Sequence, residues 1–301
     1  MLQTLARRED VTDLVSGYGH VVVDECHHVP AAAFEHAVKQ IPARHWLGLT
    51  ATPYRRDKLD DLIGLQLGPV RHTITHVIRQ ADGSQNADRA AADRLDLALA
   101  GTDSALRPRP VLHVHQTGFC YTGDVDPSAP GGIATVYRAL VADQARTAQV
   151  VADVTAALGR GRHCLLLTQW TAHLEAFTDT LSAKGFDPVV LRGGMGAKAR
   201  KDALARLAPT GEALLVVATG SYVGEGFDCP ILDTLFLAAP IAFKGRLVQY
   251  AGRILRPHPG KTTAEVHDYH DTATPVLASS LAKRAPGYTS LGFPAPRPRI
   301  R

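Results

Sequence analysis

Two adjacent carboxylates stand at the end of a short apolar run near the start of the chain. The run His20-Val21-Val22-Val23 is followed directly by Asp24-Glu25-Cys26-His27. In an open parallel sheet, ligands bind at the carboxyl ends of the strands. An aspartate there can support Mg²⁺, and a neighbouring carboxylate can orient or deprotonate the attacking water of a nucleotide hydrolase. The structural alternative is a solvated acidic turn.

Two further strand exits contain small and hydroxyl-bearing residues. The run 45–49 ends in Thr50-Ala51-Thr52-Pro53, and the run 213–218 ends in Thr219-Gly220, followed by Gly224-Glu225-Gly226-Phe227-Asp228. Glycines let a backbone approach a ligand closely, and Asp228 can accept a hydrogen bond from a hydroxyl. Taken singly, both segments are ordinary in α/β proteins.

A basic group near the end of the chain has helical spacing. In Gln249-Tyr250-Ala251-Gly252-Arg253-Ile254-Leu255-Arg256, the residues Gln249, Arg253 and Arg256 are separated by four and three positions. They therefore share one face of a helix. Two arginines directed into a cleft can stabilise the charge that develops on a transferring phosphoryl group. A plain basic helix face is the alternative.

The composition is that of an ordinary globular protein. Of 301 residues, 45% are hydrophobic and 21% charged, and 33 Lys+Arg against 29 Asp+Glu leave a net charge of +4. This length suits two compact domains, and the weak basic excess permits a nucleic-acid partner without requiring one. No apolar run reaches the roughly 18 residues of a membrane helix, and the N-terminus has no signal-peptide layout. The four cysteines lack CxxC spacing, so we expect a reducing compartment and a cytoplasmic protein with no membrane contact.

Apolar runs alternate with amphipathic stretches, which is typical of parallel strands joined by crossover helices. We expect strands at 20–23, 45–49, 164–167, 188–191, 213–218, 234–237 and 263–267. We expect helices at 30–39, 133–158, 172–184, 197–207 and 247–255. The last five strands suffice for a complete doubly wound sheet.

Changes in composition divide the chain into four parts. Residues 79–132, rich in Ala, Asp and Arg and then in Pro and Gly, are typical of a connector between domains. The connector separates an incomplete α/β domain at 1–78 from a complete one at 133–275. Residues 276–301 form the C-terminal tail, expected to be extended and loosely held from Pro286 onward.

Taken in this order, the segments resemble the superfamily 2 helicases of the DEAD/DEAH-box class. Asp24-Glu25-Cys26-His27 is similar to the DExH box, Thr50-Ala51-Thr52 to the coupling motif, Thr219 through Asp228 to motif V, and Gln249-x-x-Gly252-Arg253-x-x-Arg256 to motif VI. Cys164 to Thr168 is similar to the weaker motif IV, and Tyr54-Arg55-Arg56-Asp57 to the restriction- and repair-type translocases. The resemblance covers roughly residues 20–70 and 150–270.

The resemblance implies two RecA-like parallel-sheet domains that clamp Mg-ATP between them and grip nucleic acid across both. It implies that Asp24 binds Mg²⁺ through water and that Glu25 activates the hydrolytic water. Residues of the second domain would reach the γ-phosphate: Gln249, Arg253 and Arg256. The other roles are ATP binding by His27, Gly224, Gly226 and Asp228, coupling of hydrolysis to domain movement by Thr50 and Thr52, and nucleic-acid contact by Thr219 and Gly220.

One part of the family's machinery is not found in the sequence. No segment reads G-x-x-x-x-G-K-[S/T], the loop whose backbone N–H groups surround phosphates. The only Gly-Lys-Thr, at 260–262, has Leu255 where the first glycine belongs and precedes a strand. About twenty residues precede the acidic box, which is too few for a strand, a phosphate loop and a helix. We therefore expect an N-terminally truncated helicase, with the loop supplied by a missing segment or a partner.

Three other clusters give weaker signals. His113-Val114-His115 with Cys120 could form part of a metal site, but no fourth ligand stands at a suitable spacing, and the alternation fits one face of a strand. Cys26 beside His27-His28 is better explained as a filler position of the acidic box than as a nucleophile with its base. Gly194-Met195-Gly196 lacks the acidic residue of a dinucleotide site.

The leading hypothesis is a portion of an ATP-dependent helicase or translocase, with ATP and Mg²⁺ as cofactors and DNA rather than RNA as partner. It requires the carboxylates at 24–25 and the arginines at 253–256 to face one another across a gap sized for a triphosphate. The alternative is a non-catalytic RecA-like module that binds nucleic acid or a partner without turning over ATP.

Overall fold

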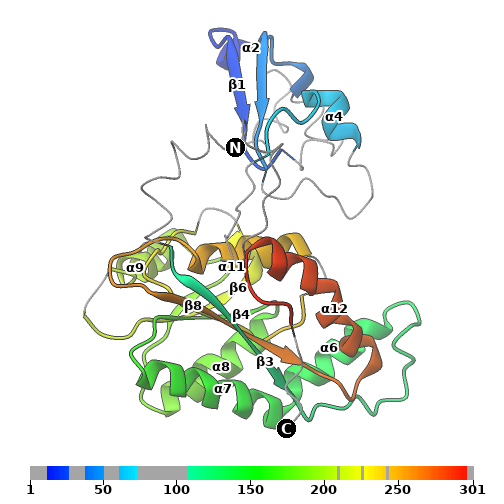
Figure 1. Ribbon diagram of the computed structural model, residues 1–301, viewed down its shortest axis with the longest axis vertical. Helices are drawn as coiled ribbons and strands as arrows, with labels where there is room; N and C mark the ends of the chain where they lie inside the picture. Colours follow the sequence, from blue (N-terminus) through cyan, green and yellow to red (C-terminus); the bar gives the residue numbers. More distant parts are fainter. Residues whose placement is uncertain are drawn as a thin grey trace, which may run out of the picture. The chain divides into compact units, whose positions relative to one another are not determined.

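The computed structural model describes residues 12–26, 38–50, 61–73, 107–208, 211–224, 227–241 and 244–296. The chain divides into two compact units, residues 1–75 and residues 76–301 (Figure 1). No helix within the described ranges is long and apolar enough to span a membrane.

The first unit contains a pair of parallel strands. Strand β1 (His20–Val23) pairs with β2 (His45–Gly48), and the imidazole rings of His20 and His45 stack across the pair. The helices α2 (Thr12–Val15) and α4 (Asp61–Leu67) accompany the pair. Val23 and Cys26 form a small core against Trp46 and Leu67.

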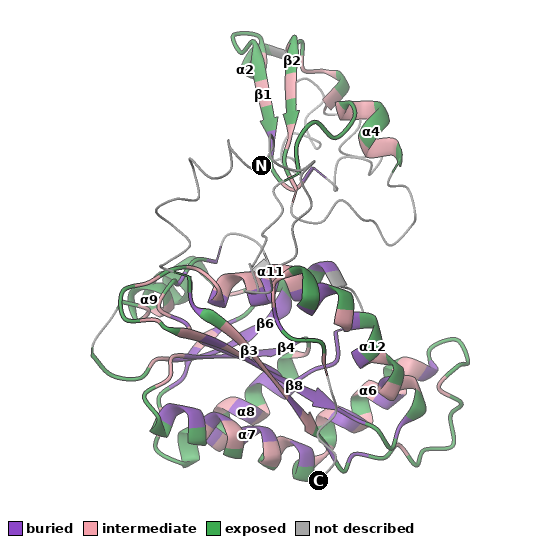
Figure 2. Cartoon of the chain, viewed as in Figure 1, coloured by how far each residue is buried: buried purple, intermediate pink, exposed green. Residues whose placement is uncertain are grey.

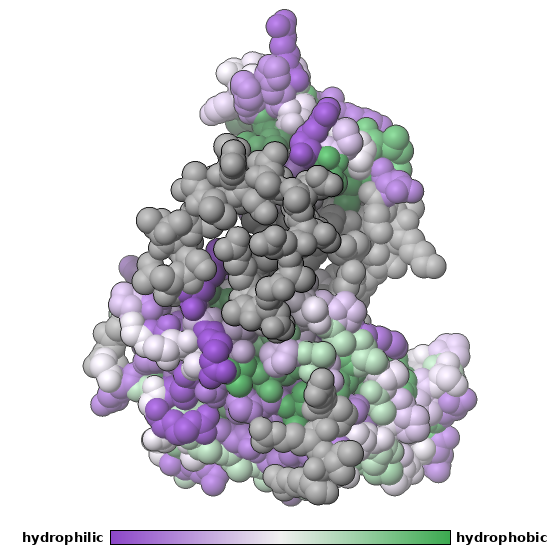
Figure 3. Space-filling model, in the orientation of Figure 1, coloured by the Kyte–Doolittle hydropathy of each residue, from purple (hydrophilic) through white to green (hydrophobic). Residues whose placement is uncertain are grey.

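Large apolar side chains are exposed on the described surface of the first unit (Figure 3). Val22 and Leu47 are 60% and 54% exposed, although each lies on a strand of the sheet. Leu65 and Val70 are exposed as well. A strand residue that turns an apolar side chain to solvent lacks the packing that normally stabilises a parallel sheet.

The second unit has a six-stranded sheet in which every pairing is parallel, in the order β3-β8-β7-β4-β6-β5. Its strands are β3 (Arg109–Gln116), β4 (Cys164–Thr168), β5 (Val189–Leu191), β6 (Leu215–Thr219), β7 (Thr234–Leu237) and β8 (Thr263–His270). Its helices are α6 (Gly132–Ala142), α7 (Gln144–Gly159), α8 (Thr171–Ala183), α9 (Ala197–Ala205), α10 (Gly220–Gly224), α11 (Lys244–Ile254) and α12 (Pro275–Ser290).

Helices cover both faces of this sheet (Figure 1). On one face, apolar residues of α7 and α8 pack on Leu166, Val217 and Phe236. On the other, apolar residues of α11 and Tyr288 of α12 pack on the alternate strand positions, such as Leu165. Strands β4, β6 and β7 are buried along their whole length (Figure 2). This three-layer arrangement is what continuous apolar strands predict, because both of their faces need cover.

The structure differs from the expected elements in three places. Strand β3, at 109–116, belongs to the second sheet although the composition assigns it to the connector. The expected helix at 133–158 is two helices, because Asp143 caps α7 by accepting a hydrogen bond from the Arg146 backbone N–H. The expected tail begins with α12, which continues through Pro286 to Ser290. The expected helix at 30–39 lies almost wholly outside the described residues.

Candidate functional site

The acidic turn of the first unit lies beside the exit of the next strand. Two backbone hydrogen bonds extend the pairing beyond the sheet, from Leu49 N–H to the Val23 carbonyl and from Cys26 N–H to the Leu49 carbonyl, each 2.9 Å long. They bring Asp24-Glu25 next to Thr50, the first hydroxyl of the coupling segment. The parallel register of β1 and β2 thus joins two motifs that the sequence separates by about 25 residues.

Glu25 has an unusual backbone conformation. Its φ is 51°, and it is the only non-glycine residue with positive φ among the described parts of the chain. A side chain in this region costs about 1–2 kcal/mol, and such strain tends to persist at functional sites. The Asp24 carboxylate accepts a hydrogen bond of 2.9 Å from the Glu25 N–H, which supports the turn. Cys26 is buried, which raises the pKa of its thiol and agrees with its interpretation as a filler position.

Two residues of the basic motif, Gln249 and Arg253, lie on α11 as their spacing predicts, but Arg256 lies two residues beyond the end of this helix. An apolar stripe on this helix is buried against the sheet: Leu247, Tyr250, Ala251 and Ile254. This stripe leaves Gln249 and Arg253 on the partly exposed side of the helix. Arg246, one turn earlier, donates to the Gln169 side chain just after β4.

Motifs V and VI meet directly in the second unit. The guanidinium of Arg256 forms an ion pair with the carboxylate of Asp228. Asp228 therefore receives a charged partner from the protein, whereas the sequence alone assigns it to the nucleotide. The position after β6 requires a glycine for a packing reason. A Cβ on Gly220 would clash with the Tyr250 hydroxyl oxygen. The absence of a side chain there lets α11 pack against α10.

We expect the substitution Gly220→Ala to destabilise the second unit by about 1–3 kcal/mol, because the added methyl must displace a buried tyrosine. Adding Tyr250→Phe, which removes the clashing hydroxyl, should recover part of the loss. The matched control is Gly252→Ala on α11, where a Cβ meets no atom within 4 Å. Urea unfolding of the three variants measures the difference, and an equal effect of Gly220→Ala and Gly252→Ala would contradict this packing.

Two buried arginines hold the segment 238–241 that follows β7. Arg284 of α12 pairs with Asp268 at 2.8 Å and donates to the Ile241 carbonyl. Arg146 of α7 pairs with Asp271 at 2.7 Å and donates to the Ala238 carbonyl. All four charged side chains are at most 2% exposed. These contacts tie the exit of β7 to the carboxyl end of β8 and the residue after it, through α7 and α12.

The Gly-Lys-Thr at 260–262 has a structural role. The Lys261 ammonium donates to the carbonyls of Pro230, Leu232 and Arg256, at 3.0, 2.6 and 3.0 Å. Burial lowers the pKa of Lys261 to about 8. The segment leads into β8 and opens no helix, so the prediction that it is no phosphate loop agrees with the structure.

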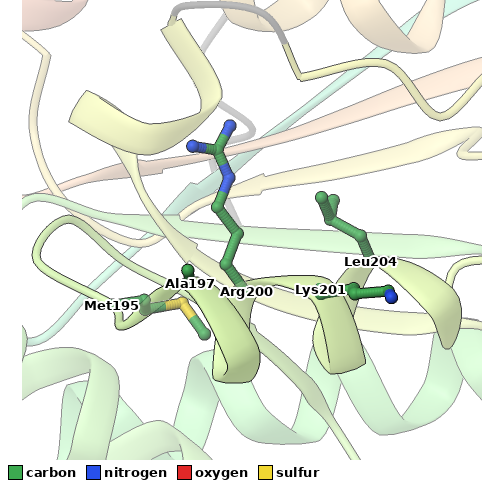
Figure 4. A pocket seen from close by; sticks show the side chains of 5 residues that line it. All are labelled: Met195, Ala197, Arg200, Lys201 and Leu204. Atoms are coloured by element: carbon green, nitrogen blue, oxygen red, sulfur yellow. The ribbon is translucent and has the colours of Figure 1, made fainter.

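A shallow hollow of about 420 Å³ lies along α9, lined by Met195, Ala197, Arg200, Lys201 and Leu204 (Figure 4). The Arg200 side chain extends away from α9, and its guanidinium lies 5.5 Å from the centre of the Tyr222 ring on α10. Arg200 thus reaches the helix that follows Thr219, while Lys201 lines the same hollow.

The predicted site residues form two groups, one in each unit. Asp24, Glu25 and Thr50 come together in the first. Thr219, Gly220, Gly224, Asp228, Gln249, Arg253 and Arg256 lie around α10 and α11 in the second. His27, Thr52 and Gly226 lie outside the described residues. Sequence reasoning missed Tyr250 and the arginines at 146 and 284, whose partners are remote in sequence.

An acidic turn and an arginine-bearing helix, each at the carboxyl end of parallel strands, define a protein of the RecA-like α/β class. Two family matches agree with this class. Residues 1–55 match the family described as type III restriction enzyme, res subunit, and residues 147–258 match the helicase conserved C-terminal domain. A putative ATP-dependent RNA helicase of Acanthamoeba polyphaga mimivirus is 29% identical over 72 residues, which cover 24% of this chain and 14% of that protein.

The comparison with solved structures supports the fold through one match with a TM-score above 0.5. Dbp5 of S. cerevisiae, bound to RNA and ADP BeF3, matches with a TM-score of 0.54 and 8% identity, covering 93% of this chain and 59% of that chain. UvsW of T4 matches with a TM-score of 0.48 and 15% identity, covering 97% of this chain and 56% of that chain. The chain thus spans less than two thirds of the length of each of these relatives.

The chain is thus similar to the superfamily 2 helicases of the DExH/DEAD class in both of its units. The acidic turn and the coupling segment fall within the restriction-enzyme match, and motifs V and VI fall within the helicase match. The expected resemblance is therefore confirmed.

Proposed function

We propose that this chain supplies the water-activating and arginine parts of an ATP-driven nucleic-acid helicase or translocase. The observation that supports this most directly is the strained Glu25, which stands at a strand end beside Asp24 and Thr50. The second support is the contact of motif VI with motif V through Arg256 and Asp228. In the proposed motor the two units close on one nucleotide.

The proposed roles follow the chemistry of the side chains. Asp24 supports Mg²⁺ through water, and Glu25 orients and deprotonates the attacking water. Arg253 and Arg256 stabilise the developing phosphoryl charge, and Arg256 leaves Asp228 to do so. Gln249 lies beside them. Contacts to the nucleotide come from His27, Gly224 and Gly226, and Thr50 and Thr52 link hydrolysis to movement of the units.

The residues of this chain fit only part of the nucleotide. Asp24 and Glu25 suit the metal and the water, but none of the 301 residues forms the G-x-x-x-x-G-K-[S/T] loop that surrounds the phosphates. The lysine of the single Gly-Lys-Thr donates to three carbonyls. We propose that the phosphate loop comes from another segment or from a partner chain, so we derive no hydrolytic step for this chain alone.

We propose that the nucleic-acid backbone runs past α9 and α10, where Arg200 reaches Tyr222 and Lys201 lines the hollow along α9. Cations bind phosphates through release of condensed counterions, so this surface needs no particular base sequence. We favour DNA over RNA because the first unit matches a restriction-enzyme family. A cytoplasmic location stays a prediction from the four widely spaced cysteines.

The double variant Arg200→Ala, Lys201→Ala is expected to weaken binding of single-stranded DNA about tenfold or more at low salt. Removing two phosphate contacts should also reduce the slope of log affinity against log salt by about 1.4, at roughly 0.7 per contact on a single strand. The control is Lys283→Ala, an exposed lysine of α12. Fluorescence anisotropy with matched DNA and RNA oligonucleotides measures both quantities. An unchanged slope would contradict the proposed surface, and tighter RNA binding would overturn the preference for DNA.

The second candidate function is a nucleic-acid- or partner-binding module without turnover. It is favoured by one observation: the second unit has a six-stranded sheet with helices on both faces, while the sequence contains no phosphate loop. Reading the genomic DNA upstream of the Met1 codon separates the two. An in-frame phosphate loop supports the motor, and a stop codon with a ribosome-binding site next to Met1 supports the module.

A further inference from the structure

Six polar side chains, four of them aromatic and two acidic, gather at the edge of the second sheet, on the face opposite α11. Strands β3 and β8 lie side by side in parallel (Figure 1), and their register places His113 beside His267 and His115 beside Tyr269. Glu265 lies two residues before His267 on the same face, because side chains alternate along a strand. Asp153 of α7 completes the group by accepting from the Tyr269 hydroxyl at 2.9 Å.

Three of these residues offer ligand atoms for one cation. The candidate atoms of His113, Glu265 and His267 all lie within 4.8 Å of one another. Glu265 Oε2 is 3.8 Å from His113 Nε2 and 3.6 Å from His267 Nε2. Ligand atoms around a tetrahedral Zn²⁺ lie about 3.3 Å apart, given bonds of roughly 2.0 Å. Small rotations of the three side chains are therefore enough to bring their ligand atoms to the spacing that a bound cation requires.

His267 points a buried, unsatisfied nitrogen at this position. The residue is only 6% exposed, and its Nε2 makes no hydrogen bond. Its other nitrogen, Nδ1, lies 2.9 Å from His115 Nε2, and His115 Nδ1 lies 3.5 Å from Asp153. Metal-binding histidines commonly have their second nitrogen oriented by such a partner.

The same group of side chains extends beyond the three ligand candidates. Asp153, His115, His267 and Glu265 form a chain with three contacts, of 3.5, 2.9 and 3.6 Å. The chain holds the His267 ring with Nδ1 toward His115 and Nε2 toward Glu265. A metal ion between His267 and Glu265 would give the unsatisfied Nε2 a partner.

We propose that His113, Glu265 and His267 bind one divalent transition-metal ion of the Zn²⁺ type, with His115 and Asp153 orienting His267. Two imidazoles and one carboxylate favour such ions over Mg²⁺, which prefers oxygen ligands. Arg160, whose guanidinium lies 3.2 Å from Glu265 Oε2, competes for the same oxygen and moves away when the metal binds. The Arg160 side chain is 53% exposed and has room to do so.

The metal fastens an edge strand to the sheet. Strand β3 pairs only with β8, so one of its sides has no strand neighbour in the described sheet. A metal ion bound by His113 on β3 and by Glu265 and His267 on β8 adds a second link between these strands. Binding therefore stabilises the second unit, since any ligand that binds only the folded state does so. The proposal involves no nucleotide or nucleic acid and is independent of the proposed function.

The test uses the full chain, freed of metal by a chelator and then titrated with Zn²⁺, Co²⁺ or Mg²⁺. We expect one Zn²⁺ per chain by elemental analysis, a visible absorption band with Co²⁺, and a higher melting temperature with either ion. Mg²⁺ should give none of these effects. His113→Gln and Glu265→Gln should each weaken Zn²⁺ binding at least tenfold. Arg160→Gln should strengthen it, because a competing cation is removed.

The control is His72→Gln, which removes an exposed imidazole from the first unit and should leave binding unchanged. Circular dichroism melting of the metal-free variants separates loss of a ligand from loss of folding. The absence of Zn²⁺ binding, binding that survives both His113→Gln and Glu265→Gln, or equal binding of Mg²⁺ would overturn the proposal.

Discussion

Replacing Arg284 with methionine is expected to lower the free energy of unfolding of the second unit by about 3–5 kcal/mol. Its guanidinium makes two hydrogen bonds of 2.8 Å to the Asp268 carboxylate and a third to the Ile241 carbonyl. The substitution leaves the Asp268 charge almost completely buried, and among the described side chains only the Tyr288 hydroxyl then donates to it. An uncompensated buried charge is among the largest single destabilising changes.

The measurement must report on one unit, because a chain with two units need not unfold in one step. The sequence has two tryptophans, Trp46 in the first unit and Trp170 in the second. In a Trp46→Phe background, tryptophan fluorescence during urea unfolding therefore reports the second unit alone. Arg138→Met, an exposed arginine of α6, is the matched control and should change stability by less than about 0.5 kcal/mol.

A second variant separates loss of the charge pair from loss of side-chain volume. In Arg284→Met, Asp268→Leu, Tyr288→Phe, all three members of the network become apolar, so most of the lost stability should return. A loss below about 1 kcal/mol for Arg284→Met alone would show that the variant does not leave Asp268 as an uncompensated buried charge. It would also show that Arg284 is not needed to hold the segment 238–241 in place.

The wild-type chain and its Glu25→Gln variant are expected to hydrolyse ATP at the same background rate, with or without nucleic acid. The chain has no phosphate loop, so Mg-ATP lacks most of the contacts that would place its γ-phosphate near Glu25. A coupled phosphate-release assay on the two proteins, purified in parallel, makes the comparison. Wild-type turnover well above that of Glu25→Gln would show that the chain binds ATP by other residues.

The result changes if a phosphate loop is encoded in frame upstream of Met1. In that longer protein, Glu25→Gln should lower turnover by about 10²–10⁴-fold, since a general base of this kind contributes that much. ATP binding, measured with a fluorescent analogue, should remain. Arg256→Ala should reduce turnover more than ATP affinity, because the proposed contact strengthens in the transition state. Equal loss of affinity in both variants would contradict the two roles.

Local sequence predicts the elements of the site well and their partners poorly. The buried strands at 164–168, 215–219 and 234–237 are continuous apolar runs, and the helix at 244–254 has a clear apolar stripe. The alternation His113-Val114-His115 fits one face of a strand, but it does not indicate the sheet to which β3 belongs. It is recognised as a strand of the sheet only from its pairing with β8, about 150 residues later. Helix α12 was missed for a similar reason: its buried Arg284 reads as a polar surface residue until Asp268 is known to face it.

The sequence alone determined the resemblance to superfamily 2 helicases and the order of the motifs. It also determined which residues stand at the ends of which strands, because strand ends and helix faces follow from local periodicity. It also determined that no phosphate loop is present. Only the tertiary structure decided that Arg256 pairs with Asp228 and that Gly220 makes room for Tyr250. It likewise decided that His113 meets Glu265 and His267. Such contacts depend on strand order and register, and in a parallel sheet each neighbour comes from a distant part of the chain.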